Sequence, residues 1–117
     1  MIRSGCSYES SFEDGVLTFR LLGEIDHHNA VNVRTEMDAE ICRVRPTRLV
    51  MELRGIEFMD SSGLGLIMGR YSLMQKIGGT TVLRDPNERL VKIFELAGLC
   101  RMIRIENSEG CGREEGK

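Results

Sequence analysis

The feature that most constrains the fold is the alternation of strand-like and helix-like segments along the chain. Residues 16–24 alternate apolar and polar side chains as a half-buried strand does, and residues 49–53 form the short apolar run typical of a central strand. Between these strands, apolar residues recur at spacings of three and four, which predicts a helix with one buried face. Its stripe consists of Ala30, Val33, Met37, Ile41 and Val44. Such alternation predicts a mostly parallel sheet with helices packed on it.

The remaining segments complete the order of elements. The dipeptide Asp14-Gly15 favours a tight turn between two strands and predicts a hairpin near the start. Asp26 is a favourable N-cap for the first helix, and Asp85-Pro86 is expected to begin the third. The predicted strands span residues 8–12, 16–24, 49–53, 80–83 and 102–105, with a loop at 54–58 and helices that end near Val44, Ile77 and Ala97. The predicted fold is therefore α/β, in the order β-β-α-β-α-β-α-β with a small mixed, mostly parallel sheet.

A chain of 117 residues is expected to form one domain. We assign residues 1–7 to a polar extension, 8–106 to the domain, and 107–117 to a polar tail that we expect to be disordered. Two cysteines, Cys42 and Cys100, fall in apolar-periodic segments and are expected to be small core residues.

Composition and charge exclude several functional classes. The net charge is −2 and the basic residues are scattered, whereas a duplex-binding protein usually carries a basic face, so nucleic acid is not an expected partner. The apolar stretches fall far short of the ~20 residues that a membrane helix needs. The first twenty residues also lack the apolar core of a secretory signal. These features predict a cytoplasmic protein that does not contact the membrane.

The segment at residues 58–65 places two serines at the predicted start of the second helix, directly after a buried strand. Unpaired N–H groups and the helix dipole stabilise an anion at such a position, and phosphate fits it well. Ser61 has two readings, as an N-cap of the helix or as a phosphate acceptor, and one site can serve both roles. Asp60 is expected to cap the helix or support the loop, with orientation of the Ser61 hydroxyl as the lesser alternative.

Four segments together resemble the STAS-domain anti-sigma factor antagonists, and most of all their sporulation type. They are Gly-Glu-Ile-Asp-His-His at residues 23–28, Phe-Met-Asp-Ser-Ser-Gly-Leu-Gly at 58–65, Gly-Arg-Tyr at 69–71 and Phe-Glu-Leu-Ala-Gly-Leu at 94–99. The resemblance extends over residues 15–106 and implies the small mixed sheet predicted above.

The resemblance also implies a function. The unphosphorylated protein would bind an anti-sigma factor that is also a serine kinase, and thereby release the sporulation sigma factor, sigma F. The kinase would use ATP to phosphorylate the first serine of the pair, Ser61, which switches binding off, and a serine phosphatase would reverse the reaction. Ser62 is the alternative acceptor if the register is shifted by one residue. The protein itself would not be an enzyme, and we expect it to be a monomer.

The expected partner-binding residues come from two segments that the resemblance places close together. They are Glu24, Asp26, His27, His28, Asp60, Ser61, Ser62, Gly63 and Gly65. Glycines inside a helix cost about 1 kcal/mol each relative to alanine, so Gly63, Gly65 and Gly69 indicate close approach by the sheet or by a partner. We expect no cofactor and no metal, because adjacent histidines at a helix start point in different directions.

Two other functional classes remain as alternatives. A hydrolase could use Ser61 or Ser62 as nucleophile with His27 or His28 as base, although the chain has no G-x-S-x-G motif. A different STAS role is the other alternative, either as a subunit of a lipid transporter or in a stress-response regulatory complex. The bound partner would distinguish these roles.

Overall fold

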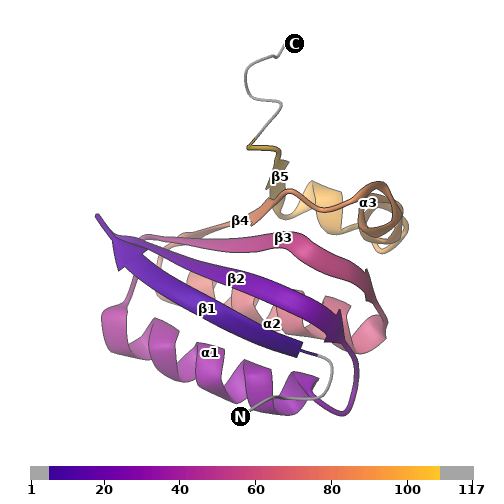
Figure 1. The fold of residues 1–117 in the computed structure, drawn as a ribbon. Helices are drawn as coiled ribbons and strands as arrows, with labels where there is room; N and C mark the ends of the chain where they lie inside the picture. Colours follow the sequence, from indigo (N-terminus) through magenta and orange to yellow (C-terminus); the bar gives the residue numbers. More distant parts are fainter. Residues whose placement is uncertain (1–5, 109–117) are drawn as a thin grey trace.

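The computed structural model describes residues 6–108 and confirms the predicted α/β fold (Figure 1). The predictions for residues 1–5 and 109–117 lie outside the described residues. The elements are β1 (Cys6–Glu13), β2 (Val16–Ile25), α1 (Ala30–Val44), β3 (Arg48–Met59), α2 (Ser61–Lys76), β4 (Thr80–Arg84), α3 (Glu88–Leu96), the short 3₁₀ turn η1 (Leu99–Arg101) and β5 (Arg104–Glu106).

One five-stranded sheet has the spatial order β1-β2-β3-β4-β5. The pair β1 and β2 is antiparallel, and the other three neighbouring pairs are parallel. Asp14 and Gly15 connect the hairpin with φ angles of 53° and 80°. Two positive φ values are what a two-residue turn of type I′ requires, and an Asp-Gly pair favours that turn. The sheet is thus mixed and mostly parallel, as the alternation of elements predicted.

The two longer helices, α1 and α2, lie side by side on one face of the sheet, and α3 lies apart from them (Figure 1). The predicted stripe on α1 is buried at Ala30, Val33, Met37 and Ile41, and it packs into one core with the inward side chains of the strands. Because right-handed crossovers connect parallel strands, α1 and α2 run in the same direction and begin at the same end of the sheet. Their first turns therefore lie near each other.

The largest correction concerns residues 54–58, which we predicted as a loop but which belong to β3. This half of the strand pairs with the end of β2 through two irregularities in register. Gly55 permits the pairing, because a Cβ atom there would lie 2.6 Å from Leu22 Cδ2 and 3.0 Å from the Leu21 carbonyl oxygen. A glycine within a strand thus marked close approach of the neighbouring backbone rather than the end of the strand.

Other corrections are smaller. The third helix begins at Glu88 and not at Asp85. Its N-cap is Asn87, whose side chain accepts a hydrogen bond from the Leu90 amide at 2.8 Å. The last strand spans Arg104–Glu106 and begins two residues later than predicted, because Met102, the expected first residue, is the C-cap of η1. The prediction of core cysteines was wrong, since Cys42 and Cys100 are both exposed.

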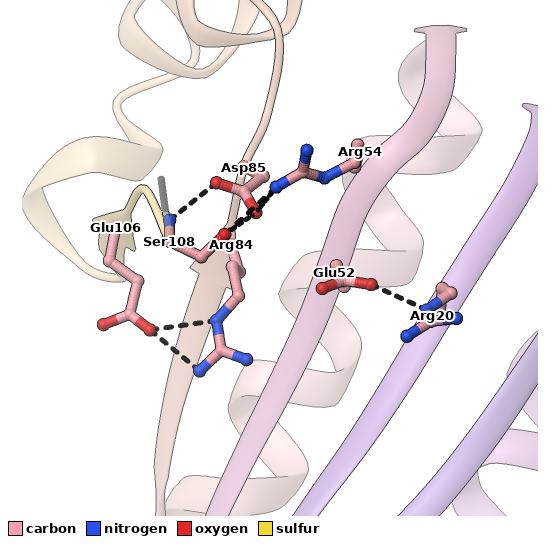
Figure 2. Close-up of polar contacts among 7 residues, drawn as sticks. All are labelled: Arg20, Glu52, Arg54, Arg84, Asp85, Glu106 and Ser108. Atoms are coloured by element: carbon pink, nitrogen blue, oxygen red, sulfur yellow. Dashed lines mark hydrogen bonds and ion pairs between the residues drawn. The ribbon is translucent and has the colours of Figure 1, made fainter. Parts of the chain in front are cut away.

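A row of charged side chains crosses the sheet on the face opposite α1 and α2. The row takes one residue from each strand, in register and with alternating sign: Glu9, Arg20, Glu52, Arg84 and Glu106. Arg20 contacts Glu52 at 2.8 Å, and Arg84 contacts Glu106 at 3.0 Å (Figure 2). Opposite charges on neighbouring strands stabilise a sheet by a few tenths of a kcal/mol each, up to about 1 kcal/mol. The row therefore supports the solvent-facing side of the sheet.

Asp85 joins three separate segments at the end of β4. Its side chain, which is 10% exposed, accepts hydrogen bonds from the Ser108 amide at 2.8 Å and the Ser108 hydroxyl at 2.6 Å. Arg54 Nη2 on β3 contacts the same carboxylate at 2.9 Å (Figure 2). Burial alone would raise the pKa of Asp85, but the hydrogen bonds from Ser108 and the charge of Arg54 outweigh burial and hold that pKa below its ordinary value.

This lowered pKa predicts a specific loss of stability in acid. The native state binds the Asp85 proton less tightly than the unfolded chain does, so the contribution is present above the unfolded pKa of about 4. It is lost as the pH falls through the lower native value. Asp85→Asn should therefore flatten the fall in the free energy of unfolding between about pH 5 and pH 2, measured by urea denaturation. An unchanged pH dependence in the variant would contradict the assignment.

Candidate functional site

The first turn of α2 carries the serine pair directly after β3. The Asp60 side chain accepts a hydrogen bond from the Ser62 amide at 2.8 Å, so Asp60 is the N-cap and Ser61 is the first helical residue. Ser61 is exposed, and within residues 6–108 its hydroxyl has no hydrogen-bond partner. Asp60, and not Ser61, therefore caps the helix. The Ser61 hydroxyl is left open to a partner.

The loop from Glu24 to Asn29 is held by a reciprocal pair of side chains. Asp26 accepts hydrogen bonds from the backbone amides of His28 at 2.8 Å and Asn29 at 3.2 Å. Asn29 Oδ1 accepts a hydrogen bond from the Asp26 backbone amide at 3.1 Å, and Asn29 Nδ2 donates one to the Glu24 backbone carbonyl at 3.0 Å. Asp26 therefore organises the turn but is not the N-cap, which is Asn29. Asn29 makes no side-chain capping hydrogen bond, because its side chain is hydrogen-bonded to the Glu24–Asp26 backbone instead.

The two segments meet at a hollow of about 280 Å³ between the first turns of α1 and α2. It is lined by His27, Ala30, Val31, Arg34, Ser62, Gly65 and Leu66. Of the predicted partner-binding residues, His27, Ser62 and Gly65 are thereby brought together. The other six predicted residues are not among the lining residues: Glu24, Asp26, His28, Asp60, Ser61 and Gly63. The centre of the His28 ring lies 4.1 Å from that of the His27 ring.

Arg34 is the cation of this hollow and was not predicted from the sequence. It is exposed, and its side chain makes neither an ion pair nor a hydrogen bond within the part of the chain that the structure describes. An arginine on the solvated side of a helix gives no sequence signal of this kind, because most such residues are simply solvated. Arg34 becomes a candidate site residue only because α2 places Ser62 beside the same hollow.

A partly buried ion pair connects α1 and α2 one turn beyond the hollow. Arg70 on α2 is only 4% exposed, and its Nε contacts Asp38 Oδ1 on α1 at 2.6 Å. Burial lowers the pKa of the Arg70 guanidinium, Asp38 opposes that effect, and the nearby charge of Arg34 adds to the lowering. Arg70 keeps its charge even so, because arginine stays protonated in proteins. This pair sets the relation between the helices that carry the two halves of the site.

The helical glycines divide into two kinds. A Cβ atom at Gly63 would lie 2.6 Å from the Met59 Cβ, so Gly63 is required by packing against the end of β3. At Gly65 and Gly69 a Cβ atom would meet nothing within 4 Å. Met68, which lies between these two glycines, is 37% exposed. This side of α2 is therefore accessible.

These environments predict opposite effects of the same substitution. Gly63→Ala should lower the free energy of unfolding by about 1–3 kcal/mol, because the added methyl overpacks Met59. Gly65→Ala should instead raise it by up to about 1 kcal/mol, since alanine is the better helix former and the site is open. Urea denaturation of the two variants measures both effects. Equal effects would contradict this division of the glycines.

Other chemistries have little support from the described geometry. Within residues 6–108, no hydrogen bond links His27 or His28 to either serine, although a serine nucleophile needs such a base within reach. The same residues contain no group of three or more side chains suited to hold a metal ion. None of the described helices is long and apolar enough to cross a membrane.

Comparison with known proteins defines the class. Residues 7–111 match the STAS domain. The chain is 40% identical over 101 residues to an anti-sigma F factor antagonist of Paenibacillus polymyxa, with 86% of each chain covered. The chain therefore belongs to the family of STAS-domain anti-sigma factor antagonists, which is a regulatory family.

Two further relatives describe its place in the family. An anti-sigma-B factor antagonist of Bacillus subtilis is 32% identical over 99 residues, which cover 77% of this chain and 82% of the relative. The anti-sigma factor antagonist SpoIIAA is 27% identical and has been solved in two forms. Its unphosphorylated form superposes with a TM-score of 0.76 over 90% of this chain and 92% of SpoIIAA. Its phosphorylated form gives 0.70 over 90% and 96%.

Proposed function

We propose that this protein is a phosphorylation-controlled anti-sigma factor antagonist of the sporulation type, acting in the cytoplasm as a monomer. Its unphosphorylated form binds an anti-sigma factor that is also a serine kinase, and this binding releases sigma F. The name of the Paenibacillus polymyxa relative supports the choice of sigma factor. The solved phosphorylated form of SpoIIAA supports control by phosphate.

The observation that carries the proposal is that the Ser61 hydroxyl is exposed and is not used to cap the helix. This hydroxyl lies at the exposed start of α2, while Asp60 performs the capping that a serine there could otherwise perform. In the transfer, the Ser61 oxygen forms a bond to the γ-phosphorus of ATP as the bond between that phosphorus and the β-γ bridging oxygen breaks. ADP leaves, and the hydroxyl proton passes to a base on the kinase. A serine phosphatase hydrolyses the phosphate and restores the binding form.

The proposed partner surface surrounds Ser61. It consists of Glu24, Asp26, His27, His28, Asp60, Ser61, Ser62, Gly63 and Gly65. Gly63 contributes through the shape of the first turn, because its own position is buried against Met59. Val31 and Phe58 are 54% and 46% exposed beside these segments, so the surface offers apolar area together with its polar groups. Contacts of this mixed kind are typical of protein interfaces.

Phosphate would act at this surface by charge and bulk. It adds about −1.5 to −2 charges at neutral pH. The helix dipole stabilises it by about 0.3–2 kcal/mol, while the Asp60 carboxylate beside it opposes it. We therefore expect the fold to change little and the cost to fall on the interface, where a poorly compensated charge would lose its water.

The test is phosphorylation by the cognate anti-sigma kinase with Mg-ATP, followed by intact-mass measurement and peptide mapping. One phosphate on Ser61 is expected. Ser61→Ala should take up none, and Ser62→Ala, the matched control one residue away, should still take up one. Phosphate mapped to Ser62, or none from a kinase active on another antagonist, would overturn the proposal.

A stress-response role is the second candidate, supported by the similarity to the Bacillus subtilis anti-sigma-B factor antagonist. The two roles share the same switch and differ in the partner. Side-by-side binding measurements with the anti-sigma F and anti-sigma B kinases of the same organism distinguish them, since the proposal predicts tighter binding to the sigma F type.

A further inference from the structure

The register between α1 and α2 directs one arginine toward the serine pair. The helices run in the same direction, and Asp38 contacts Arg70 at 2.6 Å. One turn nearer their starts, Arg34 and Leu66 line the same hollow, and one turn further Ala30 and Ser62 line it too. The helices are thus aligned turn by turn. Arg34 is one turn below the level of Ser62.

The direction of side chains on a helix compensates for this difference of one turn. In an α-helix the Cα–Cβ bond tilts toward the N-terminus, so a long side chain covers the turn before its own position. This direction brings the first turn of α2, which carries Ser61 and Ser62, within the range of the Arg34 side chain. An arginine side chain is long enough to span one helical turn of 5.4 Å.

Other charged side chains near the hollow are engaged in hydrogen bonds or ion pairs, whereas Arg34 is not engaged within the part of the chain that the structure describes. Arg70 is engaged by Asp38, whereas Arg34 makes no ion pair within residues 6–108. Asp60 and Asp26 contribute negative charge, but both carboxylates accept hydrogen bonds from backbone amides of their own loops. His27 is the other titratable side chain that lines the hollow. An anion beside the first turn of α2 would therefore find one unengaged arginine.

We propose that Arg34, which lines the hollow together with Ser62, pairs with the phosphate of phosphorylated Ser61 at the edge of that hollow. This inference rests on the proposed phosphorylation site and adds a residue that recognises the phosphate. The guanidinium presents a fork of N–H donors that matches phosphate oxygens in a bidentate way, which lysine does not. Pairing engages Arg34 within the chain and leaves a net negative charge at the surface. The unphosphorylated form presents Arg34 to the partner instead.

The test installs phosphoserine at position 61 during synthesis of the full chain, so that no kinase is needed. The second ionisation of the phosphate, with a pKa of about 6, is followed by ³¹P NMR. An adjacent cation favours the dianion. We therefore expect Arg34→Ala to raise the titration midpoint by about half a pH unit or more, and Arg34→Lys to raise it less. Arg43→Ala, at the far end of the same helix, is the matched control and should leave the midpoint unchanged.

The outcomes separate this inference from the proposed function. If Arg34→Ala leaves the midpoint unchanged while phosphoserine still abolishes kinase binding, the switch stands and the Arg34 pairing is wrong. If Arg34→Ala raises the midpoint but both forms of the parent chain bind the kinase equally, the pairing stands and the proposed function fails. Circular dichroism should show the same fold for every variant, because Arg34 and Arg43 are exposed.

Discussion

Ser61→Asp should weaken binding to the anti-sigma kinase by about 100-fold or more, which corresponds to about 2.7 kcal/mol. The carboxylate places a negative charge at the exposed start of α2, where the proposed interface would remove its water without a matching cation from the partner. Poorly compensated charges in interfaces cost several kcal/mol. Isothermal titration calorimetry with the purified kinase measures the change directly.

The same helix provides the control for this prediction. Ser72 is exposed on α2, three turns beyond Ser61, and Ser72→Asp introduces an identical charge away from the hollow. It should change the affinity less than about threefold, because exposed charges are screened by salt. Comparable losses from both substitutions would mean that net charge, rather than the position of Ser61, controls binding.

Asp38→Ala should lower the free energy of unfolding by about 2–3 kcal/mol. Breaking a fully buried ion pair costs about 3–5 kcal/mol, since the remaining charge is left without compensation. The 36% exposure of the Asp38 side chain places the expected loss for this pair below that range. Urea denaturation measures the loss. Affinity for the kinase should fall as well, because the pair sets the relation between the two helices that carry the site.

Two further variants test the cause of this effect. In the double variant Asp38→Ala with Arg70→Met, an apolar side chain of similar length replaces the stranded guanidinium, so much of the lost stability should return. Arg43→Ala breaks an exposed pair with Glu40 on α1 and should change stability by less than about 0.5 kcal/mol. A double variant no more stable than Asp38→Ala would contradict the ion-pair explanation.

The sequence was sufficient for the fold because its periodic patterns are local. The period of two in β2 and the stripe on α1 each determine one element and the face that it buries. The same patterns failed where a contact distant in sequence decides the outcome. Residues 54–58 were predicted as a loop, but their place in β3 depends on the approach of Leu22, on the neighbouring strand, to Gly55. Cys42 was assigned to the core, although it lies one position off the buried stripe at Ile41.

The candidate site was predictable only in part for the same reason. The serine pair and the Asp60 cap follow from the local sequence at a strand-to-helix junction. Arg70 and Arg34 do not, because the role of each depends on how α1 lies against α2. A charged residue amid an apolar helix face reveals neither its burial nor its partner, and Arg70 acquires both only from Asp38 across the helix pair.

Release of the sigma factor from its complex with the anti-sigma kinase tests the central claim most directly. The chain is added to the purified complex without ATP, either unmodified or with phosphoserine at position 61, and free sigma factor is measured by size-exclusion chromatography. The account predicts release by the unmodified chain and none by the phosphorylated chain at the same concentration. Equal release by both forms, or none by either, would contradict it.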